Sequence, residues 1–179
     1  MDTATAESAD ELQLIQQATQ GDKSAFQALY QRHHQRVYAL CLRMAANTEL
    51  ADELCQDCFV RLWHKLAMFD GRSQFSTWLH RLCVRQILNS LKAHQRFWQR
   101  FLPEDTLSAE QVEQMQVSEP YHQLDKLIMQ LPERMRMVFV LSAMEGYQHD
   151  EIAVLLDIAV GTSKNQLFKA KQQLQEMLK

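Results

Sequence analysis

The sequence predicts an all-α protein made of two small helical domains, and two observations carry this prediction. The 179 residues include only four glycines and three prolines, too few for a turn-rich β architecture, whereas the abundant Leu, Gln, Ala, Met and Arg favour helix. Apolar residues also recur at three- and four-residue spacing through most of the chain. With 46% hydrophobic residues, the chain is expected to fold rather than to stay disordered.

The first domain, residues 1–96, is expected to contain three helices. They run from Asp22 to a break near Asn47, from Thr48 to about Phe69, and from Phe75 or Ser76 to about Arg96. Asp22 and Thr48 are suitable N-caps, because their side-chain oxygens can accept hydrogen bonds from the first turn. Acidic residues in the first turns of the second helix interact favourably with the positive, N-terminal end of its dipole.

The segment 97–119 lacks helical periodicity and is expected to be a flexible acidic linker. Residues 103–119 contain five acids and no base, with a short helical piece expected at 109–115. The second domain, residues 120–179, is expected to hold four helices, with Pro132 in the first turn of a helix that runs to Glu145.

The charge distribution points to nucleic acid. The net charge is only −3, but residues 61–100 hold eight basic residues and one acid, a net charge of +7. Residues 161–179 carry +3, while residues 1–60 hold nine acids and four bases. Two basic surfaces separated by an acidic connector are typical of a protein that contacts DNA at two places.

The C-terminal segment carries a helix-turn-helix pattern. Gly146 can take the positive φ that ends one helix, and Ile152 and Ala153 fall on one face of the next. Residues 157–159 then make a tight connection, with Ile158 turned inward, before a second short helix with a basic outer face. An ordinary helical hairpin with a solvated basic face is the alternative, which the joint spacing disfavours.

Two segments of the chain resemble regions 2 and 4 of the sigma-70 family. The first comprises residues 51–63 and the motif Phe69-x-Gly71-x-Ser73-x-Phe75-x-Thr77-Trp78-Leu79-x-Arg81; the second comprises Leu131-Pro132-Glu133-x-x-Arg136 and the helix-turn-helix pattern. With only these two regions, the chain is similar to the compact extracytoplasmic-function group. The resemblance implies a promoter-recognition subunit of bacterial RNA polymerase, with no catalytic activity and no cofactor of its own.

The resemblance also implies where the chain binds DNA. The positions through which the family reads the minus-thirty-five element are occupied by Lys164, Asn165, Gln166, Phe168 and Lys169. The loop and helix that capture the minus-ten element hold Arg72, Ser73, Gln74, Arg81, Arg85, Asn89 and Lys92. A merely charged surface is the alternative for the last four. Phe168 could pack rather than read bases, and Trp78 is expected to pack in the core.

The helix of residues 49–69 has two faces. Helical spacing predicts a core face made of Ala51, Leu54, Cys55, Cys58 and Leu62. The family resemblance implies that the opposite face grips the clamp helices of the polymerase's largest subunit through Glu53, Gln56 and Asp57. A solvated helix face is the alternative for those three residues.

Five positions depart from the family pattern. Asn165 and Gln166 stand where the family usually has Ser and Arg, Ser163 replaces a β-branched apolar residue, and Gln148 takes a cap position that is often Ser or Thr. Asn and Gln suit adenine edges, so the upstream element is expected to be read more through A·T pairs than in the family at large. Arg85 stands where the group often has Asn.

The implied partners are core RNA polymerase, promoter DNA and an anti-sigma protein, with the free chain a cytoplasmic monomer. The polar N-terminus is not a signal peptide, and no stretch reaches membrane-spanning length. One alternative function is an autonomous helix-turn-helix regulator. A second is a metal or thiol sensor, suggested by Cys55-x-x-Cys58, although buried thiols without a metal fit these core positions better.

Overall fold

The chain folds into helices joined by short turns, as the composition predicts. The computed structural model describes the backbone of residues 3–101 and 123–179, and the side chains of residues 10–94 and 123–179; these residues contain no strand. In chain order the elements are α1 (Thr3–Thr19), α2 (Lys23–Ala45), α3 (Thr48–Lys65), the 3₁₀ turn η1 (Leu66–Met68), α4 (Phe75–Phe101), α5 (Gln123–Met129), α6 (Glu133–Phe139), the π-helical turn η4 (Val140–Met144), α7 (His149–Leu156) and α8 (Val160–Met177).

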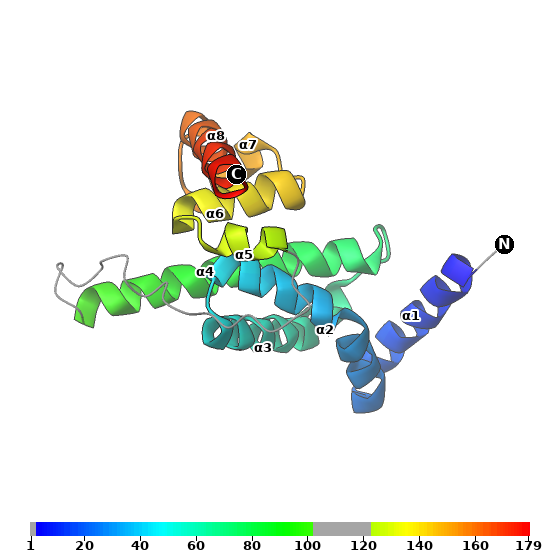
Figure 1. The fold of residues 1–179 in the computed structure, drawn as a ribbon. Coiled ribbons are helices and arrows are strands. Elements are labelled where there is room, and N and C mark those ends of the chain that lie inside the picture. The colour runs from blue at the N-terminus through cyan, green and yellow to red at the C-terminus, as the bar shows by residue number, and fades with distance from the viewer. Residues whose placement is uncertain (1–2, 102–122) are drawn as a thin grey trace.

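Helices α2, α3 and α4 pack side by side, and α1 is joined to the N-terminal end of α2 (Figure 1). Helix α1 was not expected from the polar N-terminal sequence. Its apolar residues Ile15 and Ala18 are nevertheless buried in the core. The Glu11 carboxylate also lies 2.7 Å from Nε2 of His33 on α2. Helix α1 is therefore stabilised by contacts with residues distant in the sequence, rather than by a helical pattern of its own.

The helix ends follow local capping chemistry. The Asp22 carboxylate accepts hydrogen bonds from the backbone N–H groups of Ser24 and Ala25, at 2.8 and 3.2 Å, which confirms the predicted cap. For α3 the predicted cap is wrong. Asn47, not Thr48, accepts the hydrogen bond from the Leu50 N–H at 2.8 Å, because the chain turns one residue earlier, at Ala46, which has a φ of 52°.

Two helix ends lie away from their predicted positions. Helix α3 ends at Lys65 and continues only as the 3₁₀ turn η1. Helix α4 continues to Phe101, past the end expected near Arg96, so the predicted linker begins with helical residues. The remainder of that linker, including the helical piece expected at 109–115, lies outside the described residues.

The second domain contains the expected four helices if α6 and η4 are counted as one continuous helix. Gly146 ends that helix with a φ of 74°, as the pattern predicts. Asp157 takes the same left-handed region, with a φ of 56°, and turns the chain from α7 into α8 while Ile158 packs against the core. At 18 residues, α8 is longer than the short helix expected, since Ala170 and Leu174 are also buried.

The second domain rests on the first. Figure 1 shows α5 to α8 stacked over α2 and α4. Buried apolar residues of both domains form one continuous cluster, and α2 contacts both α5 and α6. Residues of the two predicted DNA-binding surfaces therefore lie near the junction between the domains.

Candidate nucleic-acid interface

Helix α8 presents four of its five predicted base-reading residues to solvent. Lys164, Asn165 and Lys169 are exposed, and the Phe168 ring is 61% exposed, so Phe168 does not pack in the core. The helix begins with no side-chain cap, which leaves its first N–H groups open beside these residues. This end of α8 has the exposure and charge that a helix needs to enter a major groove.

The fifth residue, Gln166, points elsewhere. Its side chain is half-buried and lines a cavity of about 240 Å³ between the domains, together with Leu91 and Lys92 of α4. Its Oε1 atom is buried and finds no hydrogen-bond partner among the described residues. In this arrangement Gln166 does not share the free surface of Asn165.

Ser163 departs from the apolar residue usual in the family, and the structure gives a reason. Its side chain is fully buried, and its hydroxyl lies 2.9 Å from Nδ1 of His149, at the start of α7. A hydrogen-bonded Ser–His pair therefore joins the two helices of the helix-turn-helix. At the start of the first helix, the Glu151 carboxylate accepts a hydrogen bond from the Gln148 N–H at 2.8 Å.

Helix α4 carries the predicted basic stripe. Arg81, Arg85 and Asn89 are exposed and follow one another at four-residue spacing. Lys92 continues the stripe but is half-buried, because its ammonium group donates a hydrogen bond to the Leu155 carbonyl of α7 at 3.1 Å. The stripe is thus free at its first three positions and engaged by the second domain at its fourth.

The loop before α4 is open to solvent. The Asp70 carboxylate accepts a hydrogen bond from the Arg72 N–H at 3.1 Å, and Gly71 has a φ of 74°, which together fold the loop back on itself. The side chains of Arg72, Ser73 and Gln74 are all exposed. The Arg72 Nε atom also lies 3.2 Å from the Asp70 carboxylate, so the loop is shaped locally while its three predicted base-contacting side chains stay exposed to solvent.

The aromatic residues behind this loop pack with each other. The Phe75 and Trp78 rings lie 5.3 and 5.5 Å from the Phe69 ring, and His33 adds an edge contact to Phe75 at 5.3 Å. Phe75 is only 4% exposed and Trp78 is half-buried. This confirms the prediction that Trp78 packs, and gives both rings the role of supporting the loop.

Helix α3 shows the two predicted faces. All five residues of the expected core face are buried. Glu53, Gln56 and Asp57 are exposed on the other face, but they are not equivalent. The Asp57 carboxylate accepts a hydrogen bond from the Ser90 hydroxyl of α4 at 2.9 Å, so it also ties α3 to α4.

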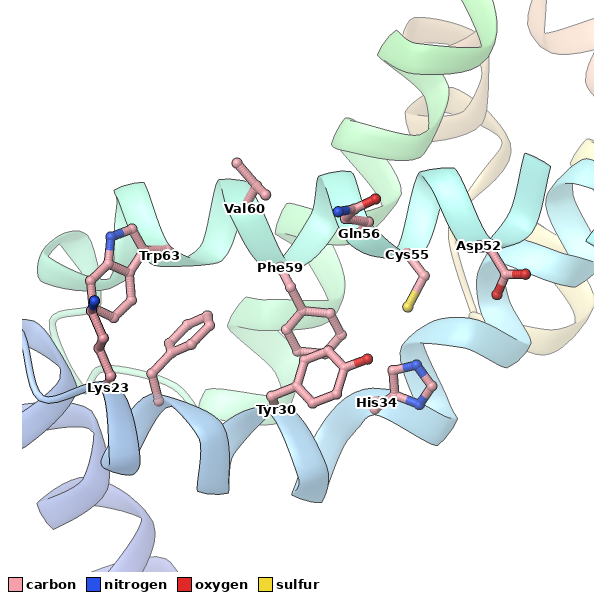
Figure 2. A pocket seen from close by; sticks show the side chains of 10 residues that line it. Lys23, Tyr30, His34, Asp52, Cys55, Gln56, Phe59, Val60 and Trp63 are labelled. Atoms are coloured by element: carbon pink, nitrogen blue, oxygen red, sulfur yellow. The ribbon is translucent and has the colours of Figure 1, made fainter. Parts of the chain in front are cut away.

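A groove between α2 and α3 lies beside this polar face and was not expected from the sequence (Figure 2). It encloses about 660 Å³, and its lining is mostly apolar and aromatic. Tyr30, Val60 and Trp63 stay 38%, 51% and 37% exposed there, and Gln56 sits at its edge. Helical spacing could assign Tyr30 to an apolar stripe, but only the pairing of two helices makes a groove.

The four cysteines are free thiols buried in the core of the first domain. Interactions with the neighbouring thiols of Cys55 and Cys58 on α3, together with burial, raise the pKa of Cys41 above its ordinary value. The Cys58 thiol lies 3.8 Å from the Cys83 carbonyl oxygen of α4. Across the described ranges, no group of three or more His, Cys, Asp and Glu residues is arranged to hold a metal ion.

No helix within residues 3–101 and 123–179 has both the length and the apolar character needed to cross a bilayer.

Comparisons with known proteins agree with this geometry. The protein-family model for Sigma-70 region 2 matches residues 29–97, and the family model for Sigma-70, region 4 matches residues 121–174. The ECF RNA polymerase sigma-E factor of Escherichia coli strain K12 is 30% identical over 172 residues, covering 89% of each chain. The ECF RNA polymerase sigma-E factor of Haemophilus influenzae is 27% identical over 189 residues, covering 97% of each.

A solved structure shares the fold. The sigma factor RpoE of Bartonella quintana, in complex with the anti-sigma factor NepR, superposes with a TM-score of 0.55 at 20% identity, over 86% of this chain and 96% of that one.

Proposed function

Because the chain belongs to the extracytoplasmic-function sigma factors of the sigma-70 family, we propose how its own residues recognise a promoter. Residues 1–96 bind core RNA polymerase and the minus-ten element, and residues 120–179 bind the minus-thirty-five element. RNA synthesis belongs to the polymerase, and this chain supplies the specificity. The observation that carries the proposal is the pair of exposed basic helix surfaces, on α4 and α8, each within a matched sigma region.

At the minus-thirty-five element, α8 enters the major groove. Asn165 is exposed at the start of α8 and can pair its amide with the N6 and N7 atoms of adenine, while Lys164 and Lys169 contact phosphates or guanine. Gln166 joins them only once its side chain leaves the cavity beside α4. Because amide side chains pair well with adenine, the protein should prefer A·T pairs in the minus-thirty-five element.

At the minus-ten element, the loop and α4 act in sequence. Arg72, Ser73 and Gln74 hold the edge of an unstacked base, and Arg81, Arg85, Asn89 and Lys92 hold phosphates and upstream base edges. The exposure of all three loop residues supports this assignment.

Core polymerase binds the exposed polar face of α3 through Glu53, Gln56 and Asp57. The apolar groove next to Gln56 supports this assignment, because interfaces combine a polar rim with an apolar centre. An anti-sigma protein is expected to cover the same surfaces, as NepR binds a sigma factor of the same fold. The free chain is proposed to be a monomer that acts in the cytoplasm, where promoter DNA and polymerase are found.

Run-off transcription with core polymerase over a pooled promoter library tests the function. Transcripts that depend on the added chain are expected, with aligned upstream sequences that contain both elements and an adenine preference upstream. Replacing Asn165 (Asn165→Ala) should weaken discrimination at one base pair by about 1–3 kcal/mol. Gln175→Ala, an exposed amide on another face of α8, is the matched control. Tight binding of the isolated chain to a palindrome, without polymerase, would instead establish an autonomous regulator.

A further inference from the structure

We propose that His149 and Ser163 form a positioning pair, which sets the direction of α8 and thereby the bases that Asn165 and Lys169 reach in the minus-thirty-five element. The inference deepens the proposed function and rests on it, because that function places α8 in the major groove. Neither member of the pair touches a base. Both act through the helix that carries the reading residues.

The pair is a hydrogen bond between two side chains of the second domain. The Nδ1 atom of His149, the first residue of α7, lies 2.9 Å from the hydroxyl oxygen of Ser163 in the first turn of α8. Either neutral tautomer of the ring allows this bond, since a hydroxyl can donate or accept. The bond therefore joins the start of one helix to the start of the next.

Ser163 occupies a place on α8 where the neighbouring buried residues are apolar. It is fully buried, and Ala170 and Leu174 are buried further along the same face. Of the residues in α7 and α8, all of which the structure describes, Ser163 is the only polar one that is buried. A buried hydroxyl loses its hydrogen bonds to water, so it needs the His149 ring as a partner. The pair therefore constrains α8 at a point where an apolar residue would only fill space.

Two attachments hold the first turn of α8 against α7. The chain itself joins this turn to the end of α7 through residues 157–159, where the Ile158 N–H donates to the Ala153 carbonyl at 3.0 Å. The pair joins it to the start of α7. A hydrogen bond weakens steeply as its angle departs from linearity, whereas apolar contacts have no preferred direction. The pair therefore fixes the rotation of α8 about its own axis as well as its distance from α7.

The rotation of α8 decides where its outer residues point. Successive residues of a helix are turned by about 100°, so Asn165 lies about 200° and Lys169 about 240° round the helix from Ser163. Both side chains are exposed, on the side of α8 opposite the pair. A reading side chain must be held within roughly 10–20° of its productive direction. Loss of the pair should therefore blur base reading by Asn165 while the domain stays folded.

Base selection by the reconstituted holoenzyme, over promoters randomised in the minus-thirty-five element, tests the proposal. Ser163→Ala removes the hydroxyl with little change of volume, and should reduce the adenine preference at the base pair read by Asn165 about fivefold. That base pair is identified as the one at which Asn165→Ala loses its preference. In the double variant the two losses should not add, because both act on the same contact.

Two substitutions of His149 provide a finer comparison. His149→Asn keeps a hydrogen-bonding group at the same number of bonds from the backbone as Nδ1, and should retain most of the base preference. His149→Gln moves that group one bond further, to the position of Nε2, and should lose the preference as Ser163→Ala does. Ser142→Ala, at a half-buried position of η4 outside the helix-turn-helix, is the matched control and should leave the preference unchanged.

Thermal unfolding followed by circular dichroism shows whether each variant is folded. If Ser163→Ala loses helix content, the comparison of His149→Asn with His149→Gln decides the question. Binding that is weaker by the same factor for every sequence, with an unchanged base profile, overturns the proposal, because the pair would then only stabilise the domain. A shallower dependence of affinity on salt concentration in His149→Asn also overturns it, because His149 would then contact a phosphate directly.

The proposed function and the positioning pair fail in different ways. A wild-type chain that supports no promoter-dependent transcription refutes the proposed function. A wild type whose adenine preference is lost in Asn165→Ala but kept in both Ser163→Ala and His149→Gln refutes the positioning pair alone.

Discussion

The surface proposed for polymerase and the surfaces proposed for DNA differ in what covers them. Glu53 and Gln56 of α3 are exposed beside an open apolar groove. On the DNA side, Lys92 of α4 and Gln166 of α8 are held in the junction between the domains. The chain therefore leaves the surface proposed for polymerase exposed and covers part of the surfaces proposed for DNA.

Under the proposed function, the side chains of Lys92 and Gln166 must leave their contacts in the domain junction before they can reach DNA. Substitutions in the junction should remove the contrast between the two kinds of surface, and substitutions in the groove and the basic stripe should make it quantitative.

The largest effect is expected at Arg136, which supports the junction itself. Arg136→Met leaves the Leu131, Met44 and Ala45 carbonyls without this donor, and should lower the free energy of unfolding by about 3 kcal/mol. Urea unfolding followed by circular dichroism measures it. Arg134→Met, at an exposed position of the same helix, should change the stability little. Equal stabilities of the two variants would show that the buried guanidinium does not hold the junction.

A smaller effect is expected in the open groove. Val60 is 51% exposed there, and Val60→Glu places a charge in a surface that polymerase must desolvate. Affinity for core polymerase should fall about tenfold, or 1.4 kcal/mol, with unchanged thermal stability. Leu12→Glu, at a 44% exposed apolar residue of α1, is the matched control for fluorescence binding assays. A tenfold loss in both variants would assign the effect to surface charge in general.

The free part of the basic stripe should act through phosphates. Arg85→Ala should weaken promoter binding by the holoenzyme about equally for all sequences. It should also reduce the slope of log affinity against log salt concentration by about one. Titrations of promoter DNA at several salt concentrations measure the slope. Arg61→Ala, at an exposed position of α3, is the control. A change of base preference without a change of slope would assign Arg85 to base reading instead.

The smallest effect concerns pH. Burial lowers the pKa of His80 below its ordinary value of 6.5, helped by Arg36 and Arg81 and opposed by Glu145. Below that value the unfolded chain takes up a proton before the folded chain does, so this contribution to stability is complete above pH 6.5 and is lost as the pH falls. Unfolding measured at about pH 7.5 and about pH 5.5 should differ less in His80→Gln than in the wild type. A larger difference in the variant would mean that protonation of His80 stabilises the folded chain.

The features that sequence predicts correctly depend on neighbours within a few residues. The buried face of α3, the Asp22 cap and the positive φ of Gly146 each follow from local spacing or local backbone chemistry. The shift of the α3 cap from Thr48 to Asn47 is also local, but it depends on the left-handed turn at Ala46, a conformation that its residue type does not favour.

The features that sequence misses depend on residues far apart in the chain. Helix α1 is held by Ile15 and by the contact of Glu11 with His33, and the apolar groove exists only where α2 meets α3. The family resemblance implied that Gln166, like Asn165, reads bases, but the local sequence contains no information about the domain that packs over Gln166. Which residues a helix presents is a local property, whereas which of them are covered is not.

The most direct test of the account is the affinity of promoter DNA for the chain with and without core polymerase, measured by fluorescence anisotropy at one salt concentration. We predict specific binding by the holoenzyme, and binding by the free chain that is at least about a hundredfold weaker, a difference of about 2.7 kcal/mol. Equally tight and specific binding by the free wild-type chain would contradict the account.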